Sequence, residues 1–235
     1  MENSGLPFCT WFLVMLFMTT TKTGFSACEL QRQIGHKRYM TIWSVMHRLR
    51  TVMGKRDDLY LLSDMIEFDE GYFEKQVQEL TKSNSKRGGG SERQINVAVM
   101  AESTPLEDLK SGKISNHCQF FKMKVLRSHM SAEIESLIKD SLDPNAVVFS
   151  DKSTSYFNIE NYLESHIAEK STKQTTITKL KLVHIVISNA KRNFLGVYHK
   201  INGEYLENFL DVYKLNRRYF KSIFERLVVA SVYPY

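Results

Sequence analysis

Two aspartates occupy positions that are costly for an acid, and their chemistry indicates a divalent cation. Asp69 interrupts the strand-like run IEFDEGYF, and Asp151 directly follows a short apolar run in VVFSD. A carboxylate among residues that would otherwise be buried is costly unless something pairs with it. Two such carboxylates on neighbouring strands repel each other, and a shared cation removes that repulsion. In the alternative interpretation, both are ordinary surface residues at strand ends. Glu67 and Glu70 flank Asp69, and we expect both to point away from it.

An amphipathic helix, expected over residues 179–199, supplies further candidates. His184 and Lys191 are seven positions apart, so a helix places them nearly in line, about 20° from each other. Both border an apolar stripe that consists of Leu180, Val183, Val186, Ile187, Ala190, Phe194 and Val197. They are therefore placed to face a site, although a histidine there is also a common structural residue. Arg192 and His199 follow, as groups that hold phosphates or as part of a solvated basic face.

Residues 1–60 have the pattern of an all-helical segment. The apolar run 10–21 predicts one helix, Ser26 with Glu29 forms a capping-box pattern for a second over 27–34, and a third is expected over 39–53, ending at Gly54. A short helix, a tight turn and a longer basic helix are typical of a helix-turn-helix. An ordinary three-helix bundle with a solvated basic face is the alternative. The basic residues expected to bind DNA here are Lys37, Arg38, Arg48, Arg50, Lys55 and Arg56.

The remainder, residues 61–235, has the element order of an α/β domain with a mixed sheet. Strands are expected at 64–76, 95–100, 120–126 and 146–149, and helices at 132–142, 161–166, 179–199, 204–215 and 219–229. A polar, glycine-rich stretch near 79–93 predicts a flexible loop. Three strands, a helix, a fourth strand and then helices match a ribonuclease-H-like core, flanked by helices and preceded by the helix-turn-helix segment.

Composition limits the cellular setting. The 235 residues carry a net charge of +6, which favours a polyanionic partner such as nucleic acid. The three cysteines, Cys9, Cys28 and Cys118, are neither paired at metal spacing nor even in number, so we expect small buried thiols in a reducing cytoplasm, near the nucleoid. The apolar run FLVMLFM lacks the basic start of a signal peptide and is too short to span a bilayer, so a buried helix is expected, with no membrane partner.

Several blocks of the sequence together resemble one protein family. They are GFSACELQRQIGHKRYMTIWSVMHRLR, IEFDEGYFEK, FSDKSTSY, VHIVISNAKRNFLGVYHKINGEYLENFLD and YKLNRRYF. In this order they resemble the transposases of bacterial insertion sequences, in particular the ISXO2-like transposase domain of the DDE superfamily. The resemblance extends over nearly the whole chain.

The resemblance implies a two-metal DDE site and an activity. Members bind two Mg²⁺ or Mn²⁺ ions, cut DNA at the ends of their mobile element and join the 3′ ends to target DNA, usually as homo-oligomers on double-stranded DNA. The first two acids of the family motif fall on Asp69 and Asp151. The third position, Glu in many relatives, falls on His184, and the following basic residue falls on Lys191. Asp69, Asp151 and His184 are therefore the expected metal ligands.

Relatives usually carry a cysteine-rich zinc ribbon before the helical segment. This sequence begins where that ribbon would have ended, so no zinc is expected in the chain. Two functions follow: an active transposase that recombines insertion-sequence DNA, or a truncated, impaired DNA-binding copy that acts as an inhibitor or remnant. A third, a helix-turn-helix regulator with a ligand-binding domain, leaves the acids within the strands unexplained.

Overall fold

The structure is a computed structural model of the whole chain. It describes residues 4–21, 23–76, 93–107, 114–127, 131–152, 159, 162–170, 172, 179–198, 201–218 and 222–232. The chain begins with α1 (Phe8–Thr20), α2 (Ala27–Ile34) and α3 (Tyr39–Asp58). Three strands, β1 (Met65–Glu74), β2 (Gln94–Glu107) and β3 (Ile114–Leu126), precede α4 (Ser131–Ser141). The chain continues with β4 (Val147–Asp151), β5 (Ser165–Glu169), α6 (Lys181–Val197), the 3-10 turn η4 (Gly203–Tyr205), α7 (Leu206–Arg218) and α8 (Ile223–Val232).

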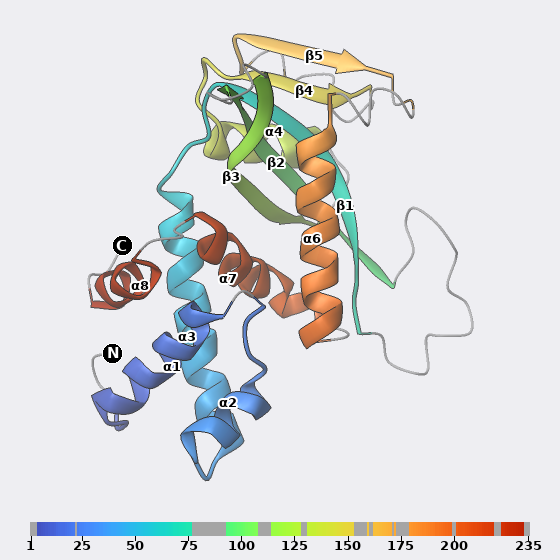
Figure 1. Cartoon of the computed structure of the whole chain (residues 1–235). Helices are drawn as coiled ribbons and strands as arrows, with labels where there is room; N and C mark the ends of the chain where they lie inside the picture. The colour runs from blue at the N-terminus through green and yellow to red at the C-terminus, as the bar shows by residue number, and fades with distance from the viewer. Residues whose placement is uncertain are drawn as a thin grey trace.

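The five strands form one mixed sheet in the order β3-β2-β1-β4-β5 (Figure 1). β1, β2 and β3 pair antiparallel, whereas β4 runs parallel to β1, and β5 runs parallel to β4. The connection from β3 to β4 passes through α4, because the two strands run in the same direction and the chain must cross back between them. This order and these directions confirm the ribonuclease-H-like fold that the sequence predicts.

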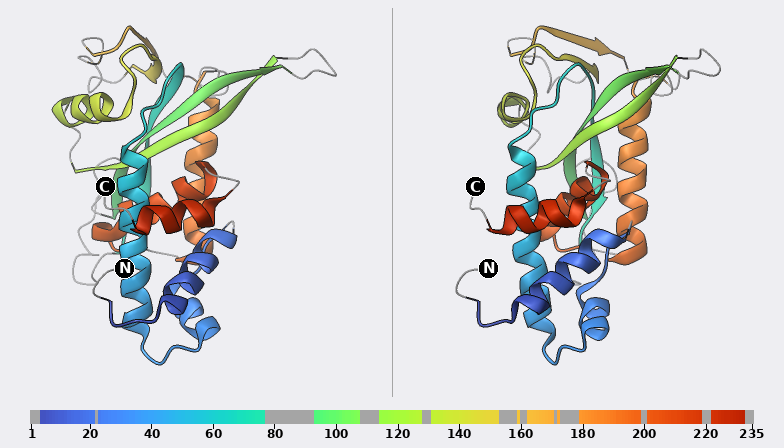
Figure 2. Two further views of the ribbon diagram at one scale, coloured as in Figure 1. Left: turned by 90° about the vertical axis from the view of Figure 1, so that its left-hand side faces the viewer. Right: turned by 60° about the vertical axis from the view of Figure 1, so that its left-hand side comes forward.

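Alternation along the strands gives the sheet two apolar faces, each covered by helices. Phe73 of β1 and Val97 and Val99 of β2 pack with α6 and α7. Phe68 and Met100, from the alternate positions, pack with α4 on the other side. Figure 2 shows α4 and α6 on opposite sides of the sheet. A side chain on β1 therefore faces α6 or α4 according to whether its residue number is odd or even.

A third apolar core joins the two ends of the chain. Trp11 and Val14 of α1, Leu49 of α3, Val212 of α7 and Leu227 of α8 are all buried in it. α1 packs on both α3 and α8, so the N-terminal helices and the last helix form one helical layer below the sheet (Figure 1). Within the described residues, no helix combines the length and the apolar character needed to cross a bilayer.

The capping of α2 follows the prediction. The Ser26 hydroxyl accepts a hydrogen bond from the amide of Glu29, and Gly35 closes the helix in the left-handed conformation at φ 69°. Glycine adopts this conformation without the clash that a side chain causes. The sharp turn that follows α2 and precedes α3 is therefore encoded locally.

Several local predictions are wrong. Residues 165 and 166, expected at the end of a helix over 161–166, instead begin strand β5, because a short ambiguous segment takes the structure of the strand with which it pairs. α3 continues through Gly54 to Asp58, and Asp151 is the last residue of β4 instead of the residue after it. Cys9 and Cys28 are exposed, since they lie on the outer sides of α1 and α2. Apart from Arg93, the predicted loop 79–93 lies outside the described residues.

An ion cluster joins α3 to α7 beneath the sheet. The Lys214 ammonium is fully buried and lies 2.9 Å from Asp211 Oδ1 and 3.2 Å from Asp57 Oδ2, and it donates to the carbonyl of Met123 at 3.2 Å. Burial alone lowers the pKa of Lys214, but the two carboxylates outweigh it and raise that pKa above its usual value. The close approach of the helices requires Gly54, because a Cβ there would lie 2.3 Å from Asp211 Oδ2.

We therefore expect Gly54→Ala to destabilise the protein by about 1–3 kcal/mol, the usual cost of overpacking, because Asp211 would have to leave Lys214. Gly196→Ala is the matched control. It also lies in a helix, but nothing stands within 4 Å of the added Cβ, so it should stabilise by roughly 0.5–1 kcal/mol. Urea unfolding of both variants measures the difference in stability. Equal effects of the two changes would contradict the close contact between Gly54 and Asp211.

Candidate active site

The pairing of β1 with β4 brings Asp69 beside Asp151. The parallel register runs from Met65 beside Val147 to Phe68 beside Ser150, and the two aspartates are the next residues on the two strands. Neighbouring strands lie about 4.8 Å apart, and side chains at matched positions project from the same face. Both aspartates therefore project on the α6 side of the sheet.

The two carboxylates are held in surroundings that disfavour their charge. Burial raises the pKa of Asp69 and is the largest effect there. Burial also raises the pKa of Asp151, and the negative charges of Asp69 and Glu70 raise it further. In addition, Asp151 Oδ1 is buried without a hydrogen-bond partner among the described residues. A buried acceptor of this kind costs free energy unless a positive group completes its coordination.

α6 contributes His184 to the same place. Its Nε2 lies 3.6 Å from Asp69 Oδ2, and the two side chains are 38% and 19% exposed. The position of Asp69 is fixed locally, since Oδ1 accepts a hydrogen bond from the amide of Glu70 at 2.8 Å. The structure thus places each of the other two expected metal ligands next to Asp69, Asp151 on the neighbouring strand β4 and His184 on α6. Within the described parts of the chain, however, no three His, Cys, Asp or Glu side chains form a ready-made metal centre.

Lys191 lies about two helical turns after His184 on the same helix. Its side chain is exposed, its Nζ lies 5.7 Å from the centre of the Phe73 ring, and its charge acts to lower the pKa of Asp69. Asn189 does not share this orientation, because its side-chain oxygen accepts a hydrogen bond from Arg192 at 3.0 Å. The helical spacing of His184 and Lys191 is therefore realised as two groups that both face the β1 acids.

Glu67 is a residue whose role the sequence reasoning missed. It lies two positions before Asp69, so it projects on the same side of β1, and the expectation that it points away was wrong. Its Oε2 accepts hydrogen bonds from the amides of Leu182 at 2.6 Å and Val183 at 3.0 Å, in the first turn of α6. The helix has no side-chain cap of its own, so Glu67 serves as its N-terminal cap from across the core. The two-residue period of a strand could have shown in advance that Glu67 and Asp69 project on the same side.

This carboxylate stabilises the position of α6 relative to β1. Glu67 is only 3% exposed, and burial raises its pKa although both amides act in the opposite direction. The partial positive charge of a helix N-terminus favours a carboxylate here. Since His184 follows Val183 directly, the bond that fixes the first turn of α6 also sets how closely His184 approaches Asp69.

On the far side of Asp151, β5 supplies a second support. Ser150 Oγ donates to the Asp151 carbonyl at 2.9 Å and lies 2.8 Å from His166 Nε2. Glu169, which pairs with Asp151 in the sheet, forms an ion pair with Lys179. The sequence analysis did not select His166, since it assigned this segment to a helix.

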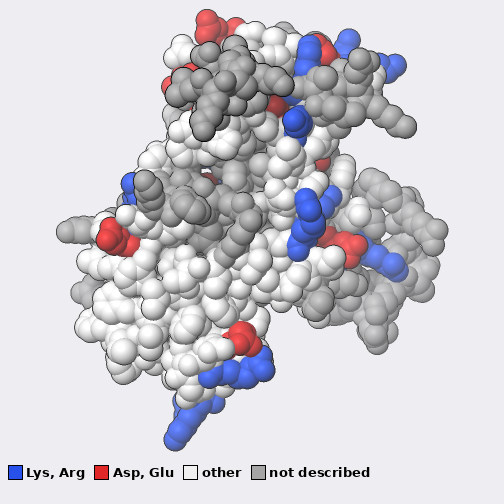
Figure 3. Space-filling model, in the orientation of Figure 1, with Lys and Arg blue, Asp and Glu red and all other residues white. Residues whose placement is uncertain are grey.

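Most, but not all, of the predicted DNA-binding residues have exposed side chains. Exposed side chains stand at the α2–α3 turn and along α3, and also on α6; they are Lys37, Arg38, Arg48, Lys55 and Arg192. Figure 3 shows Lys and Arg side chains gathered at the lower end of the molecule, over the α2–α3 turn, and along α6. Arg56 is half-buried and donates to the Tyr60 hydroxyl at 3.3 Å. His199 lies outside the described residues.

Arg50 does not belong to this surface, contrary to the prediction. It is 1% exposed, and its guanidinium lies 4.0 Å from the centre of the Phe209 ring, between α3 and α7. Helical periodicity placed it near the basic face, but the packing of α7 covers it. Its role in this structure is to join the helical layer to the sheet.

Fold and site together define a ribonuclease-H-like protein with neighbouring acids on its first and fourth strands. Residues 61–216, more than half of the chain, match the family described as the ISXO2-like transposase domain. The chain belongs to this family, and its role is in DNA transposition. No curated protein matches.

Two solved structures are similar to the chain at 9% sequence identity. The first, "Crystal structure of a pre-cleavage Mos1 transpososome", gives a TM-score of 0.35 over 100% of this chain and 83% of that one. The second, "Crystal structure of the Mos1 mariner paired end complex with Mn", gives a TM-score of 0.25 over 98% and 82%. Both TM-scores are too low to indicate a shared function.

The role of Glu67 leads to a stability prediction. Glu67→Leu leaves two amides of α6 buried without an acceptor and should destabilise the protein by about 2–4 kcal/mol. Glu67→Gln keeps one acceptor oxygen and should cost less, about 1 kcal/mol. The exposed Glu164→Leu is the control and should change stability by less than about 0.5 kcal/mol. Denaturant unfolding compares the three, and a loss in Glu67→Leu no larger than in the control would rule out the capping role.

Proposed function

We propose that this protein is a DDE-type transposase that cuts DNA at insertion-sequence ends and joins the 3′ ends to target DNA. The observation that carries the proposal is the placement of Asp69 beside Asp151, with His184 3.6 Å from Asp69. Neighbouring carboxylates in partly buried surroundings are the arrangement that a divalent cation stabilises. Family membership supplies the class of reaction.

The residues present fit Mg²⁺ or Mn²⁺. Asp69 and Asp151 offer carboxylate oxygens, which both ions prefer, and Asp151 Oδ1 is buried without a partner in the described structure. When bound, two such ions make a water, and later a 3′-hydroxyl, a stronger nucleophile and stabilise the oxygen that leaves phosphorus. His184 adds a neutral imidazole, a softer ligand than a carboxylate, so the site should prefer Mn²⁺ to Mg²⁺.

The chain's own residues then position the DNA. Lys191, whose charge already reaches Asp69, places its ammonium beside the phosphate next to the cut as a point charge. Arg192, exposed on the same helix, extends this basic surface along the DNA backbone. Glu67 and the amide of Glu70 hold the two liganding elements in place, which reduces the reorganisation needed when substrate binds.

The helical layer binds double-stranded DNA. α2, the turn after Gly35 and α3 act as a helix-turn-helix, with Lys37, Arg38, Arg48 and Lys55 on the exposed side. These side chains contact phosphates in the main, so binding weakens steeply with salt. We expect the protein to act on DNA as a homo-oligomer.

A second candidate, an impaired copy that binds DNA without cutting it, has one observation in its favour. The third ligand position carries His184 instead of an acid, and no three ligands are gathered in the described structure. Such a copy would occupy element ends and inhibit an active transposase. The experiment below separates the two.

Cleavage and strand transfer on duplex DNA that carries the element's terminal repeats test the proposal. The wild-type protein should cut and join faster in Mn²⁺ than in Mg²⁺, and Asp69→Ala and Asp151→Ala should each lower the rate by about 10³-fold or more, as loss of a group that stabilises transition-state charge does. His184→Glu should reverse the metal preference, because a carboxylate is the harder ligand.

The control is Glu164→Ala, an exposed acid remote from α6, which should leave the rate unchanged. Activity that survives loss of either aspartate would end the catalytic assignment. A wild-type protein that binds the ends but never cuts, while His184→Glu does cut, would favour the impaired copy.

A further inference from the structure

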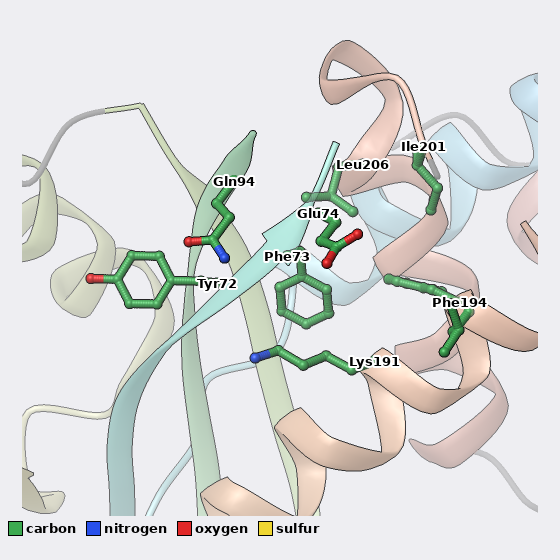
Figure 4. A pocket seen from close by; sticks show the side chains of 9 residues that line it. Tyr72, Phe73, Glu74, Gln94, Lys191, Phe194, Ile201 and Leu206 are labelled. Carbon is green, nitrogen blue, oxygen red and sulfur yellow. The ribbon is translucent and has the colours of Figure 1, made fainter. Parts of the chain in front are cut away.

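A pocket of about 260 Å³ opens between the end of β1 and the second half of α6 (Figure 4). Its floor consists of four buried apolar side chains, Phe73, Phe194, Ile201 and Leu206. The ring centroids of Phe73 and Phe194 lie 5.9 Å apart at an interplanar angle of 57°, so the two rings contact each other and make part of this floor aromatic. Of the candidate catalytic residues, Lys191 lines this space, whereas Asp69, Asp151 and His184 do not.

The rim of the pocket is polar and carries both signs of charge. Glu74, Gln94 and Lys191 line it, and all three side chains are exposed. In Figure 4 the Gln94 amide and the Glu74 carboxylate stand on the strand side, and Lys191 extends across from α6. An amide offers both a donor and an acceptor, the carboxylate accepts, and the ammonium donates.

This combination selects a flat aromatic heterocycle. An aromatic floor offers a surface on which any base can stack, whereas a saturated lipid chain would leave the polar rim unsatisfied. A phosphate is disfavoured by the apolar floor and by the Glu74 carboxylate. A nucleobase presents N–H and carbonyl groups along one edge, and carboxylate or amide side chains are the usual partners of such edges.

The pocket is connected to the acidic site by β1 and by Lys191. Phe73 lies four positions beyond Asp69 on the same face, a distance of roughly 13 Å along the strand. DNA strands advance roughly 3.4 Å for each stacked base, so this distance corresponds to a few nucleotides. Lys191 lies over the Phe73 ring while its charge acts on Asp69, so one side chain belongs to both places.

We infer that this pocket binds an unpaired nucleobase of the DNA strand whose phosphate lies at Asp69. The inference rests on the proposed function, since it assumes a DNA strand at the acids, and it adds a recognition step. A base that remains paired cannot enter a pocket closed on its inner side, so only a base that has left the stack reaches Phe73 and Phe194. The cost of unstacking that base is lowest where the duplex is already open, which directs the protein to frayed or distorted ends.

Binding measurements with the full chain, without divalent cation, test this inference. One 20-base-pair duplex carries a single unpaired 5-iododeoxyuridine, and a second has the same sequence fully paired. The wild-type protein should bind the first at least about fivefold more tightly, the lower limit of what stacking one base contributes. Irradiation should cross-link the iodinated base to Phe73 or Phe194, identified by peptide mass spectrometry.

Three variants make the result specific. Phe73→Leu removes one stacking surface, and Gln94→Leu, on the exposed rim, removes the edge contact even if Phe73→Leu fails to fold; each should reduce the preference for the unpaired base towards one. Gln33→Leu, on the exposed side of α2, is the matched control and should retain it.

Equal binding of the two duplexes by the wild-type protein would overturn the inference, as would cross-links confined to other segments. A preference that Gln94→Leu and Phe73→Leu both leave intact would overturn it as well. A pocket-dependent preference in a protein that never cuts DNA would uphold the base pocket and refute the catalytic proposal.

Discussion

The repulsion between Asp69 and Asp151 is the constraint on which the rest of the structure depends. The parallel pairing of β1 with β4 forces the two carboxylates side by side, and burial weakens the solvent screening that would relieve them. A fold that keeps such a pair loses stability in the absence of a counter-charge and gains an affinity for cations in return. The neighbouring structure serves mainly to keep this unfavourable arrangement from relaxing.

Glu67 helps to hold the strand and the helix of the site in place. It uses the same face of β1 as Asp69, but its charge is satisfied by two amides of α6, so one acid of the strand anchors the helix while the other stays available. α6 in turn carries His184, which lies beside Asp69, and Lys191, which lies over the Phe73 ring, so both side chains face β1. Below the sheet, the buried Lys214 cluster and Arg50 join α7 to α3, so the helical layer and the site belong to one packed body.

The sequence predicted the parts of this arrangement that depend on local pattern. The order of elements, the ends of α2 and the candidate ligands Asp69, Asp151 and His184 were all visible from periodicity, capping residues and family resemblance. What it did not show depends on partners distant in the chain. β5 forms only because β4 lies beside it, Arg50 is covered only because α7 packs on α3, and the role of Glu67 requires knowledge of which helix begins opposite it. The continuation of α3 past Gly54 also depends on a distant partner, because this glycine allows the close contact with Asp211 and does not end the helix.

The central claim is that Asp69 and Asp151 share a divalent cation, with His184 beside them. Anomalous diffraction from crystals soaked in MnCl₂ tests it most directly. The account predicts an anomalous peak about 2.1–2.3 Å from a carboxylate oxygen of each aspartate, lost in Asp151→Asn crystals. Ordered aspartates with no peak between them, or a peak held elsewhere in the molecule, would contradict it.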